Sequence, residues 1–376
     1  MEDTIIIAGD FCPRDRIVDF IENDRYQEIF HDVKSIINRA SYTIVNLEAP
    51  IIKDKGTPIS KSGPNLKCTD KVINAIQYVG FKGVTLANNH FYDYGEEGAL
   101  NTMQKLRENK IDYVGAGRNN EDASKILYVT IGTKKVAIIN CCEHEYSIAT
   151  RYSAGSNALN PITLYYTIKK AKSAADYVLV IVHGGIEHYQ LPTPRMKQTY
   201  RFAIDCGADA VVNHHQHCFS GYEVYKGNPI FYGLGNFCFD RKGKRNDMWN
   251  KGYMVKLCIE DNRFELLPYI QCDDTPSVQL MKDSERETFF KEIEKLNQVI
   301  TNSEELERKL KEMAVKSKRG FSPFNPYTNR YLNGLFRRGW LPSFVSKKKL
   351  MAIQNKIECE SHLERLIYVL HEELKS

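Results

Sequence analysis

The sequence lacks several features that would place it outside ordinary globular proteins. Nowhere in its 376 residues do about 18 apolar residues run together, so the sequence predicts no transmembrane helix. The first residues carry no basic segment followed by an apolar one, so no signal peptide is expected. Glycine and proline, at 23 and 13 residues, are not enriched, which excludes collagen-like and low-complexity chains. We therefore expect a cytoplasmic protein.

The sequence also lacks a dominant charge and a regular cysteine framework. The net charge of +5 is too small to indicate nucleic acid as a partner by itself, and none is expected. No pair of Cys-x-x-Cys knuckles occurs among the 10 cysteines, so a structural zinc ribbon is not expected. Cys141 and Cys142 are adjacent, and in a chain of this size the pattern favours reduced thiols in a reducing compartment.

One segment, residues 313–357, contains no acidic residue, while lysine, arginine and aromatic residues are spread along it. The composition changes near residue 273, and charged helical patterns cover residues 276–310 and 347–373. We therefore expect two regions, residues 1–275 and a helical C-terminal region, residues 276–376, with a basic aromatic loop. That loop is either a solvated surface or a contact for something anionic. The anionic partner would be a polymer, or the inner face of the membrane with the protein bound peripherally.

Short β-branched runs alternate with amphipathic stretches along the first region. The alternation predicts an α/β fold, because strands separated by helices form a layered sheet with helices on its faces. Two later strand runs, residues 253–259 and 264–269, are typical of a closing hairpin. The earlier expected strands are residues 4–8, 42–47, 83–86, 136–140, 177–183, 210–213 and 229–232, and the expected helices are residues 27–39, 71–79, 95–109, 159–175 and 193–206.

Polar groups follow directly after most of these strands, where α/β folds place their ligands. Asp10 and Glu48 follow the first two strands, Asn89 and His90 follow the third, and His183 ends the strand at residues 177–183. Carboxylate and amide oxygens together with imidazoles suit Mn, Fe or Zn. Two such metals about 3.5–4 Å apart would activate a water and clamp a phosphoryl group. In the alternative, Asp10 and Glu48 are helix N-caps or turn formers and Asn89 belongs to a turn.

Three imidazoles, His214, His215 and His217, fall within four residues after an apolar run at residues 208–212. Several neutral imidazoles at one strand end are typical of a transition-metal site. Because side chains alternate along a strand, His214 is expected to point away from the other two. His215 and His217 therefore remain as candidate ligands, and the alternative is a polar loop.

Six sequence elements resemble, in order and spacing, the CapA family, named for poly-γ-glutamate capsule proteins. The most specific combination is Asn-Asn-His with a trailing Asp-x-Gly, together with Leu-Gly-Asn-Phe-x-Phe-Asp. The resemblance covers residues 4–272 and implies a fold related to the calcineurin-like metallophosphatases, a layered β-sandwich flanked by helices. The elements are Gly9-Asp10, Asn46-Leu47-Glu48, Asn88-Asn89-His90 with Asp93 and Gly95, His183-Gly184-Gly185-Ile186-Glu187, His215-Gln216-His217 and residues 233–240.

The resemblance also implies roles for individual residues. His90 would be the general acid or a transition-state stabiliser, Asp93 would orient it, and Glu187 would line the catalytic site. Glu187 matches the family's His-Trp-Gly-x-Glu element, although Gly184 stands in place of the tryptophan. The implied ligands of one or two divalent metal ions (Mn, Fe or Zn) are Asp10, Glu48 as the bridging carboxylate, Asn89, His183, His215 and His217.

The chain departs from the metallophosphatase pattern in the first turn. That pattern has Asp-x-His, whereas here Asp10 is followed by Phe11 and Cys12. Either Cys12 ligates a soft metal, or one metal site lacks a ligand and a single ion binds. Asn213 and Gln216 also replace the glycine and proline that the family has around its final His-x-His.

Three functions remain open at this stage. The first is a metal-dependent hydrolase of the phosphoesterase type that serves bacterial capsule, exopolysaccharide or poly-γ-glutamate synthesis. The second is a hydrolase or transferase that acts on the amide bonds of a γ-glutamyl polymer. The third is a non-catalytic scaffold with a degenerate site that binds polymer or capsule-assembly partners. The capsule context rests on the resemblance alone, because fold does not fix function.

Overall fold

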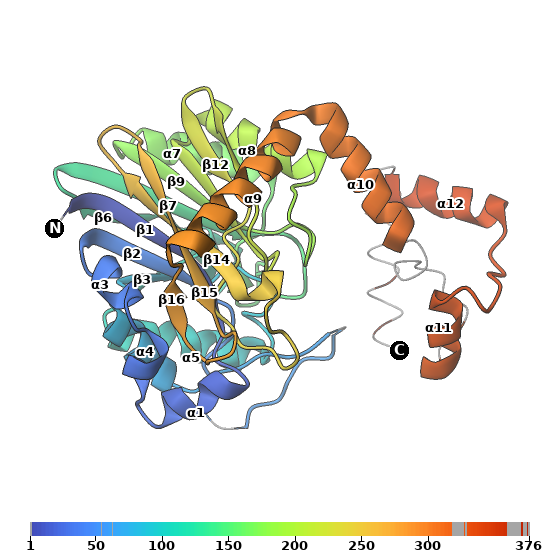
Figure 1. Ribbon diagram of the computed structural model, residues 1–376, viewed down its shortest axis with the longest axis horizontal. Helices are drawn as coiled ribbons and strands as arrows, with labels where there is room; N and C mark the ends of the chain where they lie inside the picture. Colours follow the sequence, from blue (N-terminus) through green and yellow to red (C-terminus); the bar gives the residue numbers. More distant parts are fainter. Residues whose placement is uncertain are drawn as a thin grey trace. The chain divides into compact units, whose positions relative to one another are not determined.

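The alternating pattern of strands and helices folds into two stacked β-sheets (Figure 1). A computed structural model describes residues 2–53, 55–61, 63–317, 327, 329–358, 370 and 374. The chain divides into two compact units, Met1–Glu307 and Arg308–Ser376, and both sheets belong to the first.

The first sheet is parallel at its centre and antiparallel on one side. Strands β1 to β4 run parallel in chain order, β14 pairs antiparallel with β1, and β13 adds a short parallel pairing to β1. The strands are β1 (Glu2–Phe11), β2 (Ala40–Leu47), β3 (Gly83–Thr85), β4 (Asp112–Val114), β13 (Asn236–Cys238), β14 (Lys251–Cys258), β15 (Phe264–Gln271) and β16 (Val278–Leu280).

The second sheet has a parallel centre with an antiparallel strand at each edge. Its spatial order departs from its chain order only at one edge, where β12 pairs with β10 and β11 lies outside β12. The strands, in spatial order, are β11 (Tyr222–Tyr225), β12 (Asn228–Phe231), β10 (Ala210–His214), β9 (Tyr177–His183), β7 (Lys134–Cys142) and β6 (Leu127–Ile131).

Strand alternation divides the apolar side chains among three cores. In β1, Ile5 and Ile7 join the core between the sheets, whereas Ile6 and Ala8 join the core under the helices of the first sheet. Helices α4 (Lys71–Val79) and α5 (Gly95–Glu108) pack on that outer face, and α7 (Pro161–Lys172) and α8 (Pro194–Cys206) cover the second sheet (Figure 1). The expected α/β class, a layered β-sandwich flanked by helices, is confirmed.

One expected helix, residues 27–39, forms instead as two short helices, α2 (Tyr26–Ile29) and α3 (Val33–Ile37). The break falls at Phe30, whose ring lies 6.0 Å from that of Phe237 and 6.1 Å from that of Phe11. These tertiary contacts, which periodicity does not encode, accompany the break. The other short elements are α1 (Arg16–Glu22), β5 (Ala116–Gly117), α6 (Asn120–Ala123), β8 (Gly155–Ser156) and the 3-10 helix η1 (Met248–Asn250).

Helix α9 (Asp283–Thr301) packs against the sandwich, so the first unit extends beyond the boundary expected near residue 275. The ring of Phe289 lies 4.7 Å from that of Phe219 and 5.9 Å from that of Tyr253. Helix α10 (Ser303–Ser317) follows it.

The second unit contains the described helices α11 (Arg330–Arg337) and α12 (Lys347–Glu358). Most of residues 359–373 of the expected last helix, and residues 318–326 and 328 of the acid-free segment, lie outside the described residues. Among the residues that are described, no helix is both long and apolar enough to cross a membrane.

Candidate metal centre

The predicted site residues stand where the strands of both sheets end. Asp10 lies beside Asn46 at the ends of β1 and β2, and His183 lies beside His214 at the ends of β9 and β10. The register of β1 against β2 shifts between Ala8 and Asp10, and such irregularities redirect the next side chain. Polar side chains from both sheets therefore lie together at the carboxyl ends of these strands.

A close backbone approach fixes the end of β1. A Cβ at Gly9 would lie 1.9 Å from the carbonyl oxygen of Gly235, so no larger residue fits there. The N–H of Asp10 donates to that same carbonyl at 3.2 Å. Gly9 and Gly235 thus hold the β1 end against the 233–237 turn, and Asp10 is placed by backbone contacts on both sides.

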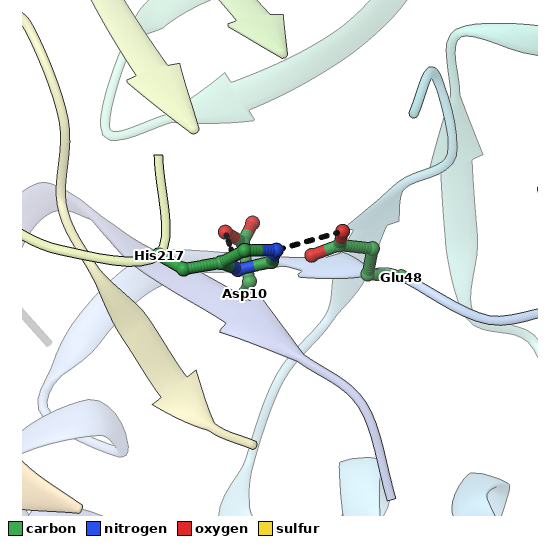
Figure 2. Close-up of side chains that lie close together, drawn as sticks. All are labelled: Asp10, Glu48 and His217. Carbon is green, nitrogen blue, oxygen red and sulfur yellow. Dashed lines mark ion pairs between the residues drawn. The ribbon is translucent and has the colours of Figure 1, made fainter. Parts of the chain in front are cut away.

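Asp10, Glu48 and His217 form one cluster, drawn in Figure 2, and their ligand atoms all lie within 4.8 Å of one another. Nδ1 of His217 is 3.6 Å from Oδ2 of Asp10, and its Nε2 is 3.7 Å from Oε1 of Glu48. Nδ1 also lies 2.9 Å from Oδ1 of Asn236, which orients the ring in the way that partners of metal-binding histidines do.

His183 connects the remaining candidates to this cluster. Its Nε2 lies 3.0 Å from Oδ1 of Asn89, 3.0 Å from Nδ1 of His215 and 3.8 Å from Oε1 of Glu48. Its Nδ1 lies 3.9 Å from Oδ1 of Asp10. All six predicted ligands are therefore brought together. Glu48 lies near both His217 in the first cluster and His183 in the second group.

The two candidate ligands after β10 adopt a backbone conformation that L-residues rarely take. His215 has φ 92° and His217 has φ 54°, both in the left-handed region. The N–H of His215 donates to Oδ2 of Asp10 at 3.3 Å. Strained backbone of this kind persists where surrounding contacts hold it, and it clusters at functional sites.

His214 lies apart from its two neighbours. Its Nε2 is 3.1 Å from the carbonyl oxygen of Ala8 in β1, so it links the two sheets behind the cluster. Burial lowers the pKa of His214 to about 4, and the ring is neutral at physiological pH.

The pKa shifts in the cluster are those expected of buried ligands that lack their cation. Burial, and after it the charge of Asp10, raises the pKa of Glu48 well above its ordinary value, and burial raises the pKa of Asp10 to about 7. Burial also lowers the pKa of His183 and His217 well below the ordinary value. Both carboxylate oxygens of Glu48 are buried without a hydrogen-bond partner. A divalent cation would satisfy these oxygens and use the neutral imidazoles, so the residues fit a metal site.

The predicted catalytic residues differ in how closely they approach this centre. His90 is buried beside Asn89, and its Nδ1 lies 2.6 Å from Oδ2 of Asp93. Glu187 is exposed and acts through its charge: burial lowers the pKa of His215, and Glu187 opposes that shift. His90 and Asp93 therefore form a contact pair, whereas the side chain of Glu187 is exposed.

Cys12 does not supply the ligand that the first turn lacks. It packs in the apolar core under the helices of the first sheet, and burial raises the pKa of its thiol well above the ordinary value. It is not part of the group of potential ligands that the described residues form around Asp10.

Three residues that support the centre were not singled out as site residues from the sequence. Asn46 donates to Oδ1 of Asp10 at 2.8 Å, Asn236 contacts His217, and Lys61 contacts Asp93. Asn46 and Asn236 belong to the strand-end motifs and could have been found there. Lys61 lies in a loop between β2 and α4 with no signal in its local sequence.

A cavity of about 210 Å³ opens beside the centre. It is lined by Asn89, His183 and His215 and by residues 143–145, 184 and 185. Glu143 pairs with Arg195 and accepts from the N–H of Gly185 at 3.1 Å. His144, which follows β7, thus lines the cavity next to the candidate ligands.

Comparisons with known proteins agree with the sequence motifs. The family described as bacterial capsule synthesis protein PGA_cap matches residues 4–241. The capsule biosynthesis protein CapA of Bacillus anthracis is 31% identical over 71% of this chain and 66% of that protein, just under two thirds of its length. The PGA biosynthesis protein CapA of Bacillus subtilis (strain 168) is 30% identical over 77% of each chain.

Among solved structures, one titled as a novel phosphatase of Mycoplasma pneumoniae has a TM-score of 0.46 at 17% identity, covering 72% of this chain and 94% of the other. The family match spans well over half of the chain and contains all the candidate ligands. The protein therefore belongs to the bacterial capsule synthesis protein family PGA_cap, to which the CapA resemblance of its sequence pointed.

Proposed function

We propose that the protein is a metal-dependent hydrolase of phosphoesters that acts in the synthesis of capsule or poly-γ-glutamate. The observation that carries the proposal is Glu48, a buried carboxylate without a hydrogen-bond partner that lies between two sets of potential ligands. The biological context is supported by the names of the two Bacillus relatives, a capsule biosynthesis protein and a PGA biosynthesis protein.

The side chains divide into two ligand sets that share Glu48. Asp10, Glu48 and His217 would hold one ion, and Glu48, Asn89, His183 and His215 would hold another. The mixture of oxygen and imidazole ligands suits Mn, Fe or Zn. Because Cys12 is packed in the core, the first set has one ligand fewer, and we expect the second set to bind its ion more tightly.

The reaction needs a polarised phosphoryl group and a proton for the leaving oxygen. A bound divalent ion supplies the polarisation and makes water a better nucleophile. His90 is placed to supply the proton: Asp93 engages its Nδ1 at 2.6 Å, which leaves Nε2 as the atom that can donate. The cavity lined by Asn89, His183 and His215 would receive the phosphoryl group of the substrate.

Metal content and hydrolysis test the proposal together. We expect one or two equivalents of Mn, Fe or Zn in the purified protein, and hydrolysis of bis(p-nitrophenyl) phosphate that a chelator abolishes. His183→Gln, in the ligand set expected to bind its ion more tightly, should reduce both the metal content and the rate by about tenfold or more, whereas exposed His31→Gln should change neither.

Two outcomes would contradict the proposal. A protein that binds no metal would be a scaffold with a degenerate site. A protein that binds metal and cleaves γ-glutamyl p-nitroanilide, but no phosphoester, would be an amide hydrolase.

A further inference from the structure

Lys61 is a buried lysine beside the proposed acid. Its side chain is 2% exposed, although the residue lies in the irregular connection between β2 and α4. The ammonium group forms an ion pair with Oδ1 of Asp93, and its Nζ lies 3.1 Å from Nδ1 of His90. Lysines are rarely buried to this extent unless they are paired, because removing the charge from water is costly.

Asp93 also holds the connection between β2 and α4 through two backbone N–H groups. Its Oδ2 accepts the N–H of Leu66 at 2.6 Å, and its carbonyl oxygen accepts the N–H of Ile59 at 2.9 Å. Asn65 donates to the carbonyl of Ile59 at 3.0 Å and closes the loop. These contacts would order the loop without Lys61, so anchoring the loop does not account for a buried ammonium group.

The carboxylate of Asp93 has a different neighbour on each oxygen. Oδ2 faces His90 and the N–H of Leu66, and Oδ1 faces Lys61. With Oδ1 fixed by a cation, the carboxylate cannot rotate away from the imidazole. Lys61 and the N–H of Leu66 thus hold opposite oxygens of the carboxylate that contacts His90, and Lys61 does so with a side chain that is only 2% exposed.

We propose that Lys61 is a positioning residue that fixes Asp93 and, through it, the imidazole of His90, so that the three side chains act as one unit. The catalytic consequence rests on the proposed function, whereas the orientation of His90 does not. A misplacement of about 1 Å in a catalytic group can cost on the order of 100-fold in rate.

The first test observes His90 directly by NMR. The short contact between Nδ1 of His90 and Asp93 should give a downfield imidazole proton resonance, assigned by its loss in His90→Gln. In Lys61→Met this resonance should shift upfield or broaden beyond detection. Exposed Lys67→Met, in the same loop, should leave it unchanged.

The second test measures turnover of bis(p-nitrophenyl) phosphate by the metal-loaded protein. Lys61→Met should lower kcat about 10- to 100-fold, with KM and bound metal near wild-type values. Lys61→Ala should recover part of kcat in ethylammonium but not in ethanol, which has the same size without the charge. A merely structural role would show no such dependence on charge.

A downfield resonance and a kcat that both stay at wild-type values in folded Lys61→Met would overturn the inference. Equal rescue by ethanol and ethylammonium would overturn it as well. If the wild-type protein hydrolyses no phosphoester, the proposed function fails, and the NMR result still decides the role of Lys61.

Discussion

Glu48 is a buried carboxylate that a bound metal ion would neutralise and coordinate. Its carboxylate is buried, its two oxygens have no hydrogen-bond partner, and its pKa is raised well above the ordinary 4.5, first by burial. A raised folded-state pKa means that the metal-free protein loses stability as pH rises above 4.5, because the folded form keeps a proton that the unfolded form releases.

Glu48→Gln should therefore be more stable than wild type in the presence of a chelator. We expect the difference in the free energy of unfolding to grow by up to about 1.4 kcal/mol for each pH unit above about pH 5. With excess Mn the order should reverse, since the amide carries no charge to hold the ion. Urea denaturation measures both, and exposed Glu96→Gln is the matched control. Equal stability of variant and wild type in chelator at every pH would show that Glu48 is not strained by burial.

Asp10 is expected to release a proton when a metal ion binds near neutral pH. Its pKa of about 7 leaves it largely protonated at about pH 6, whereas His183 and His217 are already neutral there because burial lowers their pKa. Metal affinity should increase as pH rises through the pKa of Asp10.

Titration calorimetry in buffers of different ionisation enthalpy counts these protons. More should be released at about pH 6 than at about pH 8.5, and Asp10→Asn should release about one fewer at the lower pH. Proton release that is the same in Asp10→Asn as in wild type would assign the protons to Glu48, whose pKa is also raised by burial.

At the scale of elements, the end of β1 is the part of the fold that the centre most depends on. A methyl group at Gly9 would collide with the carbonyl of Gly235, and backbone cannot move aside as a flexible side chain can. We expect Gly9→Ala to lower the free energy of unfolding by about 3 kcal/mol or more and to reduce bound metal.

Gly334→Ala is the control, because Gly334 lies in helix α11 and a Cβ added there would have no neighbour within 4 Å. It should leave metal content unchanged and stabilise its helix by up to about 1 kcal/mol. Thermal melts and metal analysis measure both variants. A Gly9→Ala protein with wild-type stability would mean that β1 and the 233–237 turn separate without cost.

The elements also show what the sequence could predict. Long strands such as β9 were expected to the residue, because β-branched runs and the polar group that ends them are local signals. The gathering of Asp10, Glu48 and His217 followed from one rule, that ligands lie beyond the carboxyl ends of strands. Lys61 could not be predicted, because its burial depends on a loop returning to Asp93, 32 residues later in the chain. The division of residues 27–39 into two helices likewise accompanies contacts with distant aromatic rings.

At the scale of the whole molecule, the change in composition near residue 273 does not coincide with the end of the first unit. Helix α9 is rich in charge, yet Phe289 and Ile293 on one face are buried in the core between the sheets. Asn297 accepts the N–H of Tyr222 at 2.7 Å, which attaches the helix to β11. A charged helix with a narrow apolar face resembles a separate helical region in sequence, and only the packing distinguishes the two.

Truncated chains can test whether the first unit ends near residue 275, where the composition changes, or beyond α9. A chain that ends at residue 275 loses the edge strand β16 as well as α9, and it exposes Phe219 and Tyr253, the aromatic partners of Phe289. Loss of the Phe289 side chain alone is expected to cost about 3–5 kcal/mol, a large share of the stability of a typical domain. The shorter chain should therefore aggregate or melt at a much lower temperature.

A chain that ends at residue 317 keeps α9 and α10 and should retain the melting temperature and metal content of the first unit. If the chain ending at 275 folds and binds metal as well as the longer one, α9 belongs with the C-terminal region after all, and the boundary lies where the composition changes.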